Sequence, residues 1–428
     1  MTGPALAEIV GASHVLEGDA AAAFAVEGRA PRWVVAPGRV EEVSRCLALA
    51  SAEGLAVAPL GRGTRRHWGA PPRALDLVLA LHRLDRVLAH EPADLTVSVE
   101  AGITLGALET HLRSFRQFLP LDPARATAST VGGIIATGAS GPYRARYGTV
   151  RDLLLGVTVV QADGTVVKGG GRVVKNVSGY DMPKLHVGAL GTLGVLVAAN
   201  LRLHPRPAAE ASWRFDFASP EAALEAALGI MDAPVVVSRL ELLDRATLAT
   251  LGSRTGTPAA LAVTVGSVAE GVRAQGARIA EICARTGAAP VPVADAEAWW
   301  TRVTDTTWPA GGEGLTLRIG TRPTDVVKAY RAVEAVVRGS LRAIAEVANG
   351  VLHLTVSGGG AESELVSRIR EGLAPLGAPC LVEHAPAAGK ASLDVWGDVG
   401  PALDLMRRLK AEFDPRGVLN PARYVGGI

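Results

Sequence analysis

The sequence predicts an α+β fold with at least two domains, the second built on an antiparallel sheet that helices cover on one face. The chain has 428 residues, which at about 150 residues per domain suggests two or three domains. Hydrophobic residues make up 48% and charged residues 20%, so a large core can form and intrinsic disorder is not expected. After residue 208 segments of helix and strand character alternate, which is typical of a sheet with helices on one face.

The first part of the chain opens with a strand–helix–strand pattern. Val40, Val43 and Leu47 recur at helical spacing, and Gly54 ends the predicted helix. Strands are expected at residues 33–36, 55–59, 75–80, 95–100, 154–161 and 166–168, and a second helix at 105–115.

Residues 204–209 are rich in proline and predict a domain boundary. The expected strands beyond it are residues 213–217, 235–240, 259–265, 314–320 and 351–356, and the expected helices are 220–231, 271–286, 323–338, 362–373 and 401–413. We therefore expect domains at 1–207 and 208–410, followed by a stiff, extended tail at 411–428.

Composition excludes several classes of protein. A net charge of +2 and 4% aromatic residues do not fit a nucleic-acid-binding surface. Cys46, Cys283 and Cys380 lie far apart, which excludes a disulfide framework, a cysteine-rich zinc site and an iron–sulfur cluster held by this chain alone, and we expect no metal site. No apolar stretch is long enough to span a membrane, and no secretory signal is apparent, so a cytoplasmic location is expected.

Several standard motifs are absent. The chain has no P-loop, no H-E-x-x-H and no G-x-S-x-G nucleophile elbow. Gly61-Arg62-Gly63 is followed by Arg66 where the dinucleotide fingerprint needs a third glycine, so that motif fails as well.

Glycine-rich segments are the main chemical signal. Residues 59–64 follow a predicted strand, and two glycines there expose backbone N–H groups that can form an anion-binding nest, although a tight turn between strands would look the same. Small hydroxyl residues and glycines alternate over residues 127–141 around a strand-like apolar run. Across residues 129–194 glycine is denser than turns usually need, which favours backbone that lies against a ligand over simple loops.

Four segments in order, residues 59–64, 127–141, 147–164 and 175–195, resemble the FAD-binding domain of the vanillyl-alcohol-oxidase (PCMH-type) flavoprotein family. The resemblance covers about residues 30–207, with residues 413–424 as a further piece. Residues 171–181 are especially similar to the GlcE-type FAD-binding subunits of bacterial glycolate oxidase. The resemblance implies two α/β subdomains that bind FAD, together with a cap domain.

The resemblance also implies which residues hold FAD. In the family, the matching loops lie around the pyrophosphate, beside the flavin, along the ribityl chain and near the adenine half of FAD. One further match is a tail residue that returns to the flavin. These residues are Pro59, Gly61, Arg62, Gly63, Thr64, Leu121, Asp122, Pro123, Thr130, Gly132, Gly133, Thr137, Gly138, Ser140, Gly141, Gly191, Thr192, Gly194, Val195 and Asn420.

Three departures from the family pattern qualify these expectations. His67 lies beyond the position where many relatives tether FAD, so a packing or surface role is expected and the cofactor is expected to be non-covalent. Leu190 stands where glutamate is common in relatives. The catalytic relatives carry H-x-G-D-G-N-x-H, whereas the nearest stretch here, residues 353–360, has one histidine and no acidic residue. An obvious base and metal site are therefore missing from the sequence.

Oxidation of a hydroxy acid needs a base near the hydroxyl and a cation for the carboxylate. Arg318 and His353 are the candidates, although a solvent-facing strand residue and a satisfied sheet histidine are the ordinary interpretations. Asp181 is expected to cap a helix at Met182. The tryptophans at 299, 300 and 308 line a pocket, a subunit interface or simply the core.

The first functional hypothesis is an FAD-binding subunit of a glycolate (2-hydroxy-acid) oxidase or dehydrogenase complex. The resemblance implies a GlcD-type flavoprotein and an iron–sulfur subunit as partners, and any membrane attachment would be peripheral, through that complex. The alternatives are a stand-alone FAD-dependent 2-hydroxy-acid dehydrogenase and a non-catalytic scaffold subunit that has lost flavin; the intact glycines argue against the scaffold.

Overall fold

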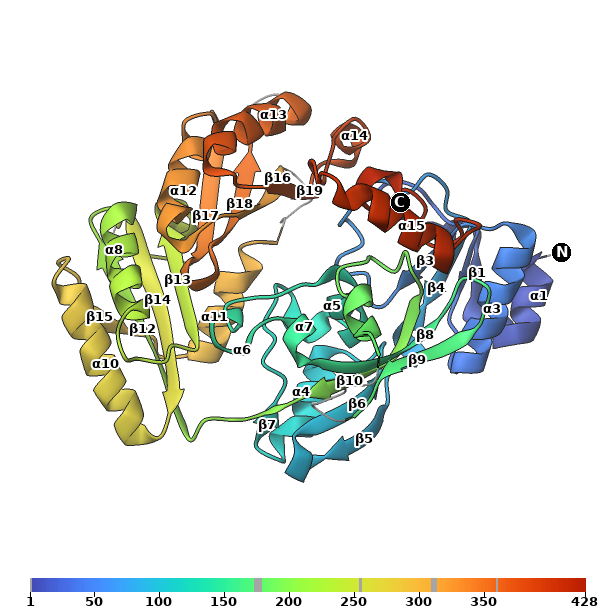
Figure 1. The fold of residues 1–428 in the computed structure, drawn as a ribbon, viewed down its shortest axis with the longest axis horizontal. Helices are drawn as coiled ribbons and strands as arrows, with labels where there is room; N and C mark the ends of the chain where they lie inside the picture. The colour runs from blue at the N-terminus through green and yellow to red at the C-terminus, as the bar shows by residue number, and fades with distance from the viewer. Residues whose placement is uncertain (1, 173–178, 254–255, 309–313, 359–360) are drawn as a thin grey trace.

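A computed structural model describes residues 2–172, 179–253, 256–308, 314–358 and 361–428. It has two lobes, and the end of the chain returns to the first one (Figure 1). Among the described residues no helix combines the length and apolar character needed to span a membrane.

The N-terminal lobe is built on two β-sheets. The smaller sheet has the order β1 (Val15–Glu17), β2 (Trp33–Val35), β4 (Leu77–Ala80) and β3 (Val57–Leu60), and β4 runs parallel to both β2 and β3. Helices α1 (Thr2–Val10) and α3 (Val40–Glu53) pack beside it, while α2 (Gly18–Ala22) contacts β1 and β2. The predicted helix at 40–50 is confirmed, and Gly54 ends it with a φ of 67°.

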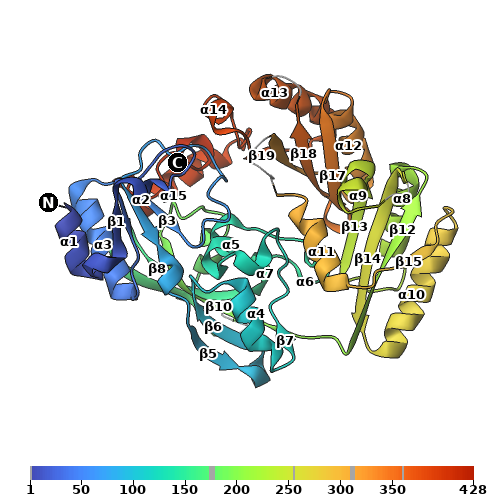
Figure 2. The same ribbon diagram turned by 180° about the vertical axis from the view of Figure 1, so that it is seen from behind.

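The second sheet of this lobe is antiparallel. Its order is β5 (Val87–Glu91), β6 (Thr96–Glu100), β10 (Val195–Arg202), β8 (Leu154–Val160) and β9 (Val166–Gly170). Four helices lie on the side of this sheet that is turned toward the C-terminal lobe (Figure 2). They are α4 (Leu105–Arg113), α5 (Val131–Thr137), α6 (Arg144–Tyr147) and α7 (Val150–Leu153). Short strands β7 (Gln117–Phe118) and β11 (His204–Pro205) pair at its edge.

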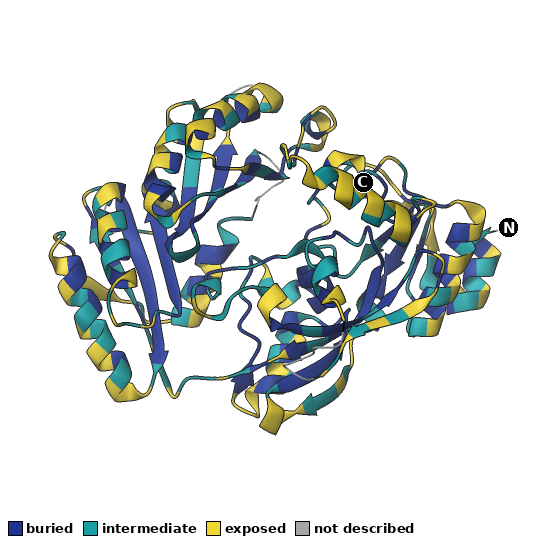
Figure 3. Ribbon diagram, viewed as in Figure 1, coloured by how far each residue is buried: buried dark blue, intermediate teal, exposed yellow. Residues whose placement is uncertain are grey.

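The C-terminal lobe is one antiparallel sheet of eight strands. Its order is β15 (Pro290–Pro292), β12 (Ala209–Phe217), β14 (Ala259–Ser267), β13 (Arg239–Asp244), β17 (Ser340–Glu346), β18 (Val351–Ser357), β16 (Leu315–Gly320) and β19 (Cys380–His384). Helices α8 (Pro220–Met231), α10 (Ala269–Ala284), α12 (Val326–Glu334) and α13 (Glu362–Leu373) cover one face, as expected (Figure 1). Most of the strands are buried, whereas the edge strand β15 and the outer surfaces of these helices are exposed (Figure 3).

The opposite face of the eight-stranded sheet turns toward the N-terminal lobe. Side chains alternate between faces along a strand, so Leu242 packs in the core under the covering helices while Leu243 packs with Trp300 on the other face. Helices α9 (Arg245–Thr250) and α11 (Ala296–Asp305) shield only part of that face. The remainder is where the two lobes meet (Figure 2).

The C-terminal segment joins the lobes. After α14 (Ala387–Lys390), helix α15 (Ala402–Phe413) lies against the N-terminal lobe (Figure 1). Val57 donates to Val418 at 2.8 Å and accepts from Asn420 at 2.8 Å, so the tail extends the sheet beside β3.

Some local predictions were wrong. The strand-like run expected within residues 127–141 is helix α5, because Thr130 caps its first turn and Gly138 its end. The strand expected at 235–240 begins only at Arg239. Asp181 makes no capping hydrogen bond with its side chain. Much of the GlcE-like segment, residues 173–178, lies outside the described residues.

Candidate functional site

An elongated cleft crosses the N-terminal lobe between the loop after β3, helix α5, the loop before β10 and the tail. Two adjoining cavities form it, and Pro59, Gly61, Thr130, Gly133 and Leu190 line both. Segments far apart in the sequence therefore converge on one groove.

Glycines keep this groove open and its walls close together. A Cβ atom on Gly61 would stand 2.1 Å from Oγ1 of Thr130. Gly191 has a φ of +69°, and a Cβ there would meet Cγ of Pro59 at 2.8 Å. Both positions exclude larger residues, one by contact and the other also by backbone conformation.

The loop after β3 presents unused backbone donors. Within the described residues, the N–H groups of Arg62, Gly63 and Thr64 make no hydrogen bond to the protein. Consecutive free N–H groups in a glycine-containing turn form a nest that binds anions. The loop therefore suits a phosphate group.

Asn420 adds a polar group at the other wall. Its Nδ2 donates to the carbonyl of Leu190 at 2.6 Å. Its Oδ1 is buried and has no partner among the described residues. A buried amide oxygen without a donor is costly, so this atom is suited to accept from a ligand.

The expected cofactor residues divide into three groups. Those that line the groove are Pro59, Gly61, Arg62, Gly63, Thr64, Thr130, Gly132, Gly133, Thr137, Gly191, Gly194 and Asn420. Ser140 and Gly141 line cavities between the lobes instead. Leu121, Asp122, Pro123, Gly138, Thr192 and Val195 line none of these cavities.

Sequence reasoning missed two buried arginines beside the groove. Arg65 donates to Oγ of Ser129 at 2.8 Å, and burial lowers the pKa of its guanidinium to about 10. Arg423 donates to the carbonyl of Arg66 at 2.7 Å, and burial lowers its pKa to about 10 as well. Arg65 directly follows the 59–64 segment and Arg423 lies in the tail piece 413–424, but neither pattern shows that the guanidinium is buried beside the groove.

A second region of the cleft lies between the lobes. Strand pairing sets Arg318 opposite His353, and His353 opposite Ile344, so all three share one sheet face. Arg318 and His353 both line the cavity there, together with Trp68 and Glu383. Nε of Arg318 is 3.1 Å from Oε1 of Glu383. The two candidates for chemistry therefore face the cleft rather than solvent or the core.

His353 is coupled to a carboxylate. Its Nε2 lies 3.2 Å from Oε1 of Glu346, whose side chain is 4% exposed. Burial alone lowers the pKa of His353, but the hydrogen bond and charge of Glu346 outweigh burial and hold the pKa above its usual range. Glu346 comes from β17, a strand that the sequence did not predict.

His67 lies at the junction of the lobes. Its ring makes edge contacts with Trp308 at 4.6 Å and with His384 at 5.3 Å between centroids. Burial, and then the neighbouring His384 and Lys390, lower the pKa of His67 to about 2, so the ring is neutral. Its carbonyl accepts a hydrogen bond from Lys390. These contacts fit the packing role expected for His67.

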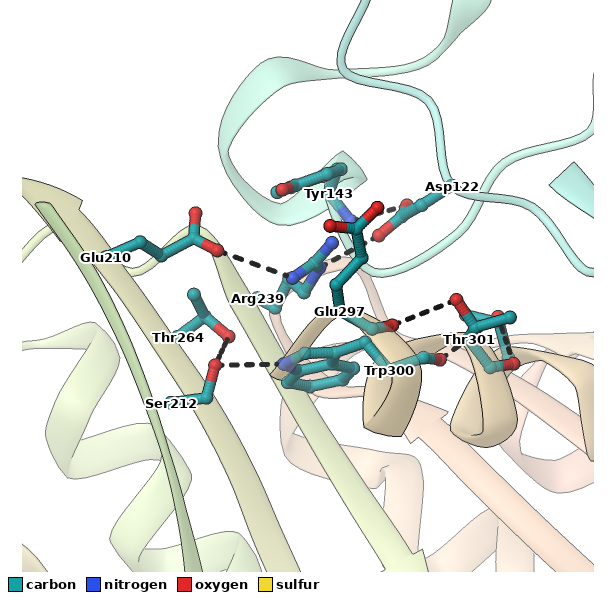
Figure 4. A network of polar contacts seen from close by, with 10 residues as sticks. Asp122, Tyr143, Glu210, Ser212, Arg239, Thr264, Glu297, Trp300 and Thr301 are labelled. Carbon is teal, nitrogen blue, oxygen red and sulfur yellow. Dashed lines mark hydrogen bonds and ion pairs between the residues drawn. The ribbon is translucent and has the colours of Figure 1, made fainter. Parts of the chain in front are cut away.

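An ion pair ties the lobes together beside the cleft (Figure 4). Nε of Arg239, on β13, donates to Oδ2 of Asp122 at 2.9 Å, and its side chain is 8% exposed. The guanidinium also lies 3.7 Å from the ring centroid of Tyr143. Asp122 thus holds the cap domain rather than lining the groove.

Comparison with known proteins identifies the family. The model described as "FAD binding domain" matches residues 31–170, and the model described as "FAD linked oxidases, C-terminal domain" matches residues 206–424. The chain belongs to the FAD-linked oxidases. Its cofactor is FAD, and it is a flavin-dependent oxidoreductase.

Relatives of this FAD-linked oxidase span nearly all of it. Glycolate oxidase subunit GlcD of Bacillus subtilis is 28% identical, covering 92% of this chain and 88% of the relative. A probable mitochondrial D-lactate dehydrogenase of Danio rerio is 31% identical, covering 93% and 85%. Glycolate oxidase subunit GlcE of Escherichia coli is 34% identical but covers 44% of this chain and 53% of the relative.

Solved structures show the same fold for this oxidase. p-Cresol methylhydroxylase with substrate bound superposes with a TM-score of 0.78 at 16% identity, covering 99% of this chain and 96% of the other. An alkyldihydroxyacetonephosphate synthase gives 0.72 at 18% identity, covering 92% and 78%. The predicted PCMH-type fold with an antiparallel cap is confirmed.

The groove fits FAD by its own chemistry. The free N–H groups of residues 62–64 are suited to the diphosphate. Gly61 and Gly191 let the groove's backbone segments lie close to Thr130 and Pro59, and the buried Oδ1 of Asn420, which has no hydrogen-bond partner among the described residues, can accept a hydrogen bond from the cofactor.

Proposed function

We propose that this chain oxidises a 2-hydroxy acid to the 2-oxo acid in the cleft between its lobes, as the FAD-binding component of a glycolate oxidase or dehydrogenase-type complex. The observation that carries the proposal is the placement of His353 and Arg318 on one sheet face that opens onto the cleft next to the glycine-lined groove. The relatives that span both lobes are a glycolate oxidase subunit and a probable D-lactate dehydrogenase, which supports this chemistry.

The residues divide the work in the following way. Oxidation removes a hydride from the substrate carbon and a proton from its hydroxyl, and bound FAD supplies the hydride acceptor. Neutral His353 takes the hydroxyl proton, and Glu346 stabilises the imidazolium that forms. Arg318 binds the substrate carboxylate and is held in place by Glu383.

The cofactor assignment is part of the same proposal. We assign FAD to the groove and keep the whole expected set as cofactor residues, with those that line the groove in direct contact. Leu121, Asp122, Pro123, Gly138, Thr192 and Val195 would act by shaping the surrounding loops. The attachment is non-covalent, because the buried ring of His67 is packed against Trp308 and His384.

A partner subunit completes the proposed complex. Because Cys46, Cys283 and Cys380 are far apart in sequence, the electrons need another chain with an acceptor. We propose a GlcD-type flavoprotein and an iron–sulfur subunit as these partners, in a complex peripheral to the inner membrane; the similarity to glycolate oxidase subunits GlcD and GlcE supports a complex of this type.

The purified chain tests the proposal directly. We expect a flavin absorbance band that moves to the supernatant on acid precipitation, and oxidation of glycolate or D-lactate with an artificial acceptor once partners are added. A band that stays with the pellet would contradict non-covalent attachment. A chain with no band after addition of FAD would overturn the proposal and favour a scaffold.

A second candidate is a stand-alone 2-hydroxy-acid dehydrogenase. The similarity to a probable D-lactate dehydrogenase favours this candidate, because that similarity extends over both lobes. The two candidates differ in one measurement. Turnover by the purified chain without partners supports the stand-alone enzyme, and turnover only with partners supports the subunit.

A further inference from the structure

One end of the interdomain cleft is acidic. A cavity there adjoins the one that contains Arg318, since Ala124, Ser140, Thr307 and His353 line both. Among the described residues that line the second cavity, none is a lysine or an arginine. Its charged walls are two glutamates, at positions 241 and 346, together with His353.

Glu241 is the unusual member of this cavity. It is 1% exposed, and neither carboxylate oxygen has a hydrogen-bond partner among the described residues. Strand pairing places it directly opposite Glu346. Oε1 of Glu346 is engaged by His353, whereas its Oε2 accepts no hydrogen bond among the described residues and forms only a long ion pair, 3.9 Å from Nη1 of Arg144.

This arrangement is expensive without a ligand. A buried carboxylate without donors loses its hydration, and like charges directly opposite in a sheet repel each other. Burial first, and then the charges of Glu346 and Asp122, raise the pKa of Glu241 well above its usual value. The site therefore attracts a proton, or any other positively charged donor that reaches the cavity.

The chemistry of the walls selects the kind of cation. No group of three or more histidine, cysteine, aspartate or glutamate side chains in the described part of the chain is placed to hold a metal ion. A protonated amino group has three N–H donors, and three oxygens of Glu241 and Glu346 accept no hydrogen bond among the described residues.

We propose that Glu241 and Glu346 bind a protonated amino group at the far end of the substrate, so that the preferred substrate is an amino-bearing 2-hydroxy acid. The inference rests on the proposed function for the hydroxy-acid end. Arg318 takes the carboxylate, His353 faces the hydroxyl, and the two glutamates lie beyond His353, in the adjoining cavity.

Paired substrates of equal size test the proposal on the holoprotein. We expect kcat/KM for 4-amino-2-hydroxybutanoate to exceed that for 2-hydroxypentanoate by about tenfold or more, which equals about 1.4 kcal/mol. Glu241→Gln keeps the shape but cannot ionise to pair with the amino group, so the ratio should fall toward one. The control Glu297→Gln removes a charge from a side chain that is 85% exposed and should keep the wild-type ratio. A wild-type ratio near one, or an unchanged ratio in Glu241→Gln, would overturn the proposal.

Calorimetry separates this inference from the proposed function. Neither 5-aminopentanoate nor hexanoate has a hydroxyl to oxidise, so their binding to the wild-type holoprotein does not depend on turnover. Tighter binding of 5-aminopentanoate supports the amino subsite even if no 2-hydroxy acid is oxidised. Equal binding of the two overturns the subsite even if 2-hydroxy acids are oxidised.

Discussion

At the scale of single residues, the candidate site depends on side chains whose surroundings change their ordinary behaviour. His353 would be a solvent-titrating imidazole on an open strand, but Glu346 holds its pKa above the usual range. Gly61 would be a replaceable turn residue, but Thr130 leaves no room for a Cβ. Both effects come from one neighbour each, so point substitutions can test them.

The His353–Glu346 pair predicts a pH dependence. If neutral His353 is the base, kcat/KM falls as the pH drops through its raised pKa. Glu346→Gln removes the charge that raises this pKa, burial then dominates, and the acid limb should move to lower pH. The measurement is kcat/KM against pH. Glu364→Gln, at an exposed position, should leave the limb in place, and an unmoved limb in Glu346→Gln would reject the coupling.

Gly61→Ala should lose FAD. The new Cβ would stand 2.1 Å from Oγ1 of Thr130, so the loop or Thr130 must shift into the groove. We expect the flavin content per chain, measured by absorbance, to fall severalfold. Gly372→Ala, on α13, is the matched control. The nearest atom to its Cβ would be the carbonyl oxygen of Ala332 at 3.7 Å, which is an ordinary contact. Full flavin content in Gly61→Ala would contradict this account of the groove.

At the scale of elements, the tail is fixed by one carboxylate at the end of α15. Asp414, 2% exposed, accepts from the N–H groups of Val418 at 2.9 Å and Leu419 at 2.8 Å, and pairs with Nζ of Lys410 at 2.6 Å. Lys410 also donates to the carbonyl of Thr192 at 2.9 Å. The same cluster therefore positions the tail and the loop beside the groove.

Asp414→Ala should weaken both the fold and cofactor binding. It removes the carboxylate that pairs with the largely buried Lys410, which keeps only carbonyl acceptors on Thr192 and Leu419. Breaking a buried ion pair in this way costs about 3–5 kcal/mol. Urea unfolding should show that loss, and flavin content should fall because Asn420 follows in the same segment. Asp404→Ala, at a side chain 84% exposed on the same helix, should change stability by less than about 1 kcal/mol. Equal effects of the two substitutions would argue against the anchor.

At the scale of the whole molecule, the two lobes must keep a constant spacing for the cleft to work. The Asp122–Arg239 pair lies across their junction with side chains 16% and 8% exposed. Lys390, with a fully buried side chain, reaches from the cap lobe to Glu27 at 3.1 Å. Such buried charged contacts specify one arrangement of the lobes because each charge is costly when unpaired.

A double-mutant cycle measures that junction. Asp122→Ala and Arg239→Met should each destabilise the protein by about 3–5 kcal/mol, because each leaves a buried charge without its hydrogen-bonded partner. The double variant should lose less than the sum, since no lone charge remains. The exposed pair Glu221 and Arg331 provides the comparison, with a coupling below about 1 kcal/mol. Additive losses at Asp122 and Arg239 would show that the pair does not tie the lobes.

The sequence by itself determined the features that depend on local pattern. The glycine and hydroxyl segments from residue 59 to 195 carried the family resemblance that implied the FAD-binding fold, and helical periodicity placed α3, α8 and α13. Apolar alternation predicted most strands of the cap. These signals are local, since they depend on spacing within a few turns or residues.

Only the tertiary structure showed which charged side chains gather on the face of the C-terminal sheet that is turned toward the N-terminal lobe. Strand β17 was not predicted, so the sequence analysis found no acidic partner for His353 within residues 353–360, although Glu346 stands seven residues before it. The turn between β17 and β18 folds these residues together, and pairing with β13 adds Glu241. Register between strands depends on contacts far apart in the chain, and a shift of one residue would turn every one of these side chains to the opposite face.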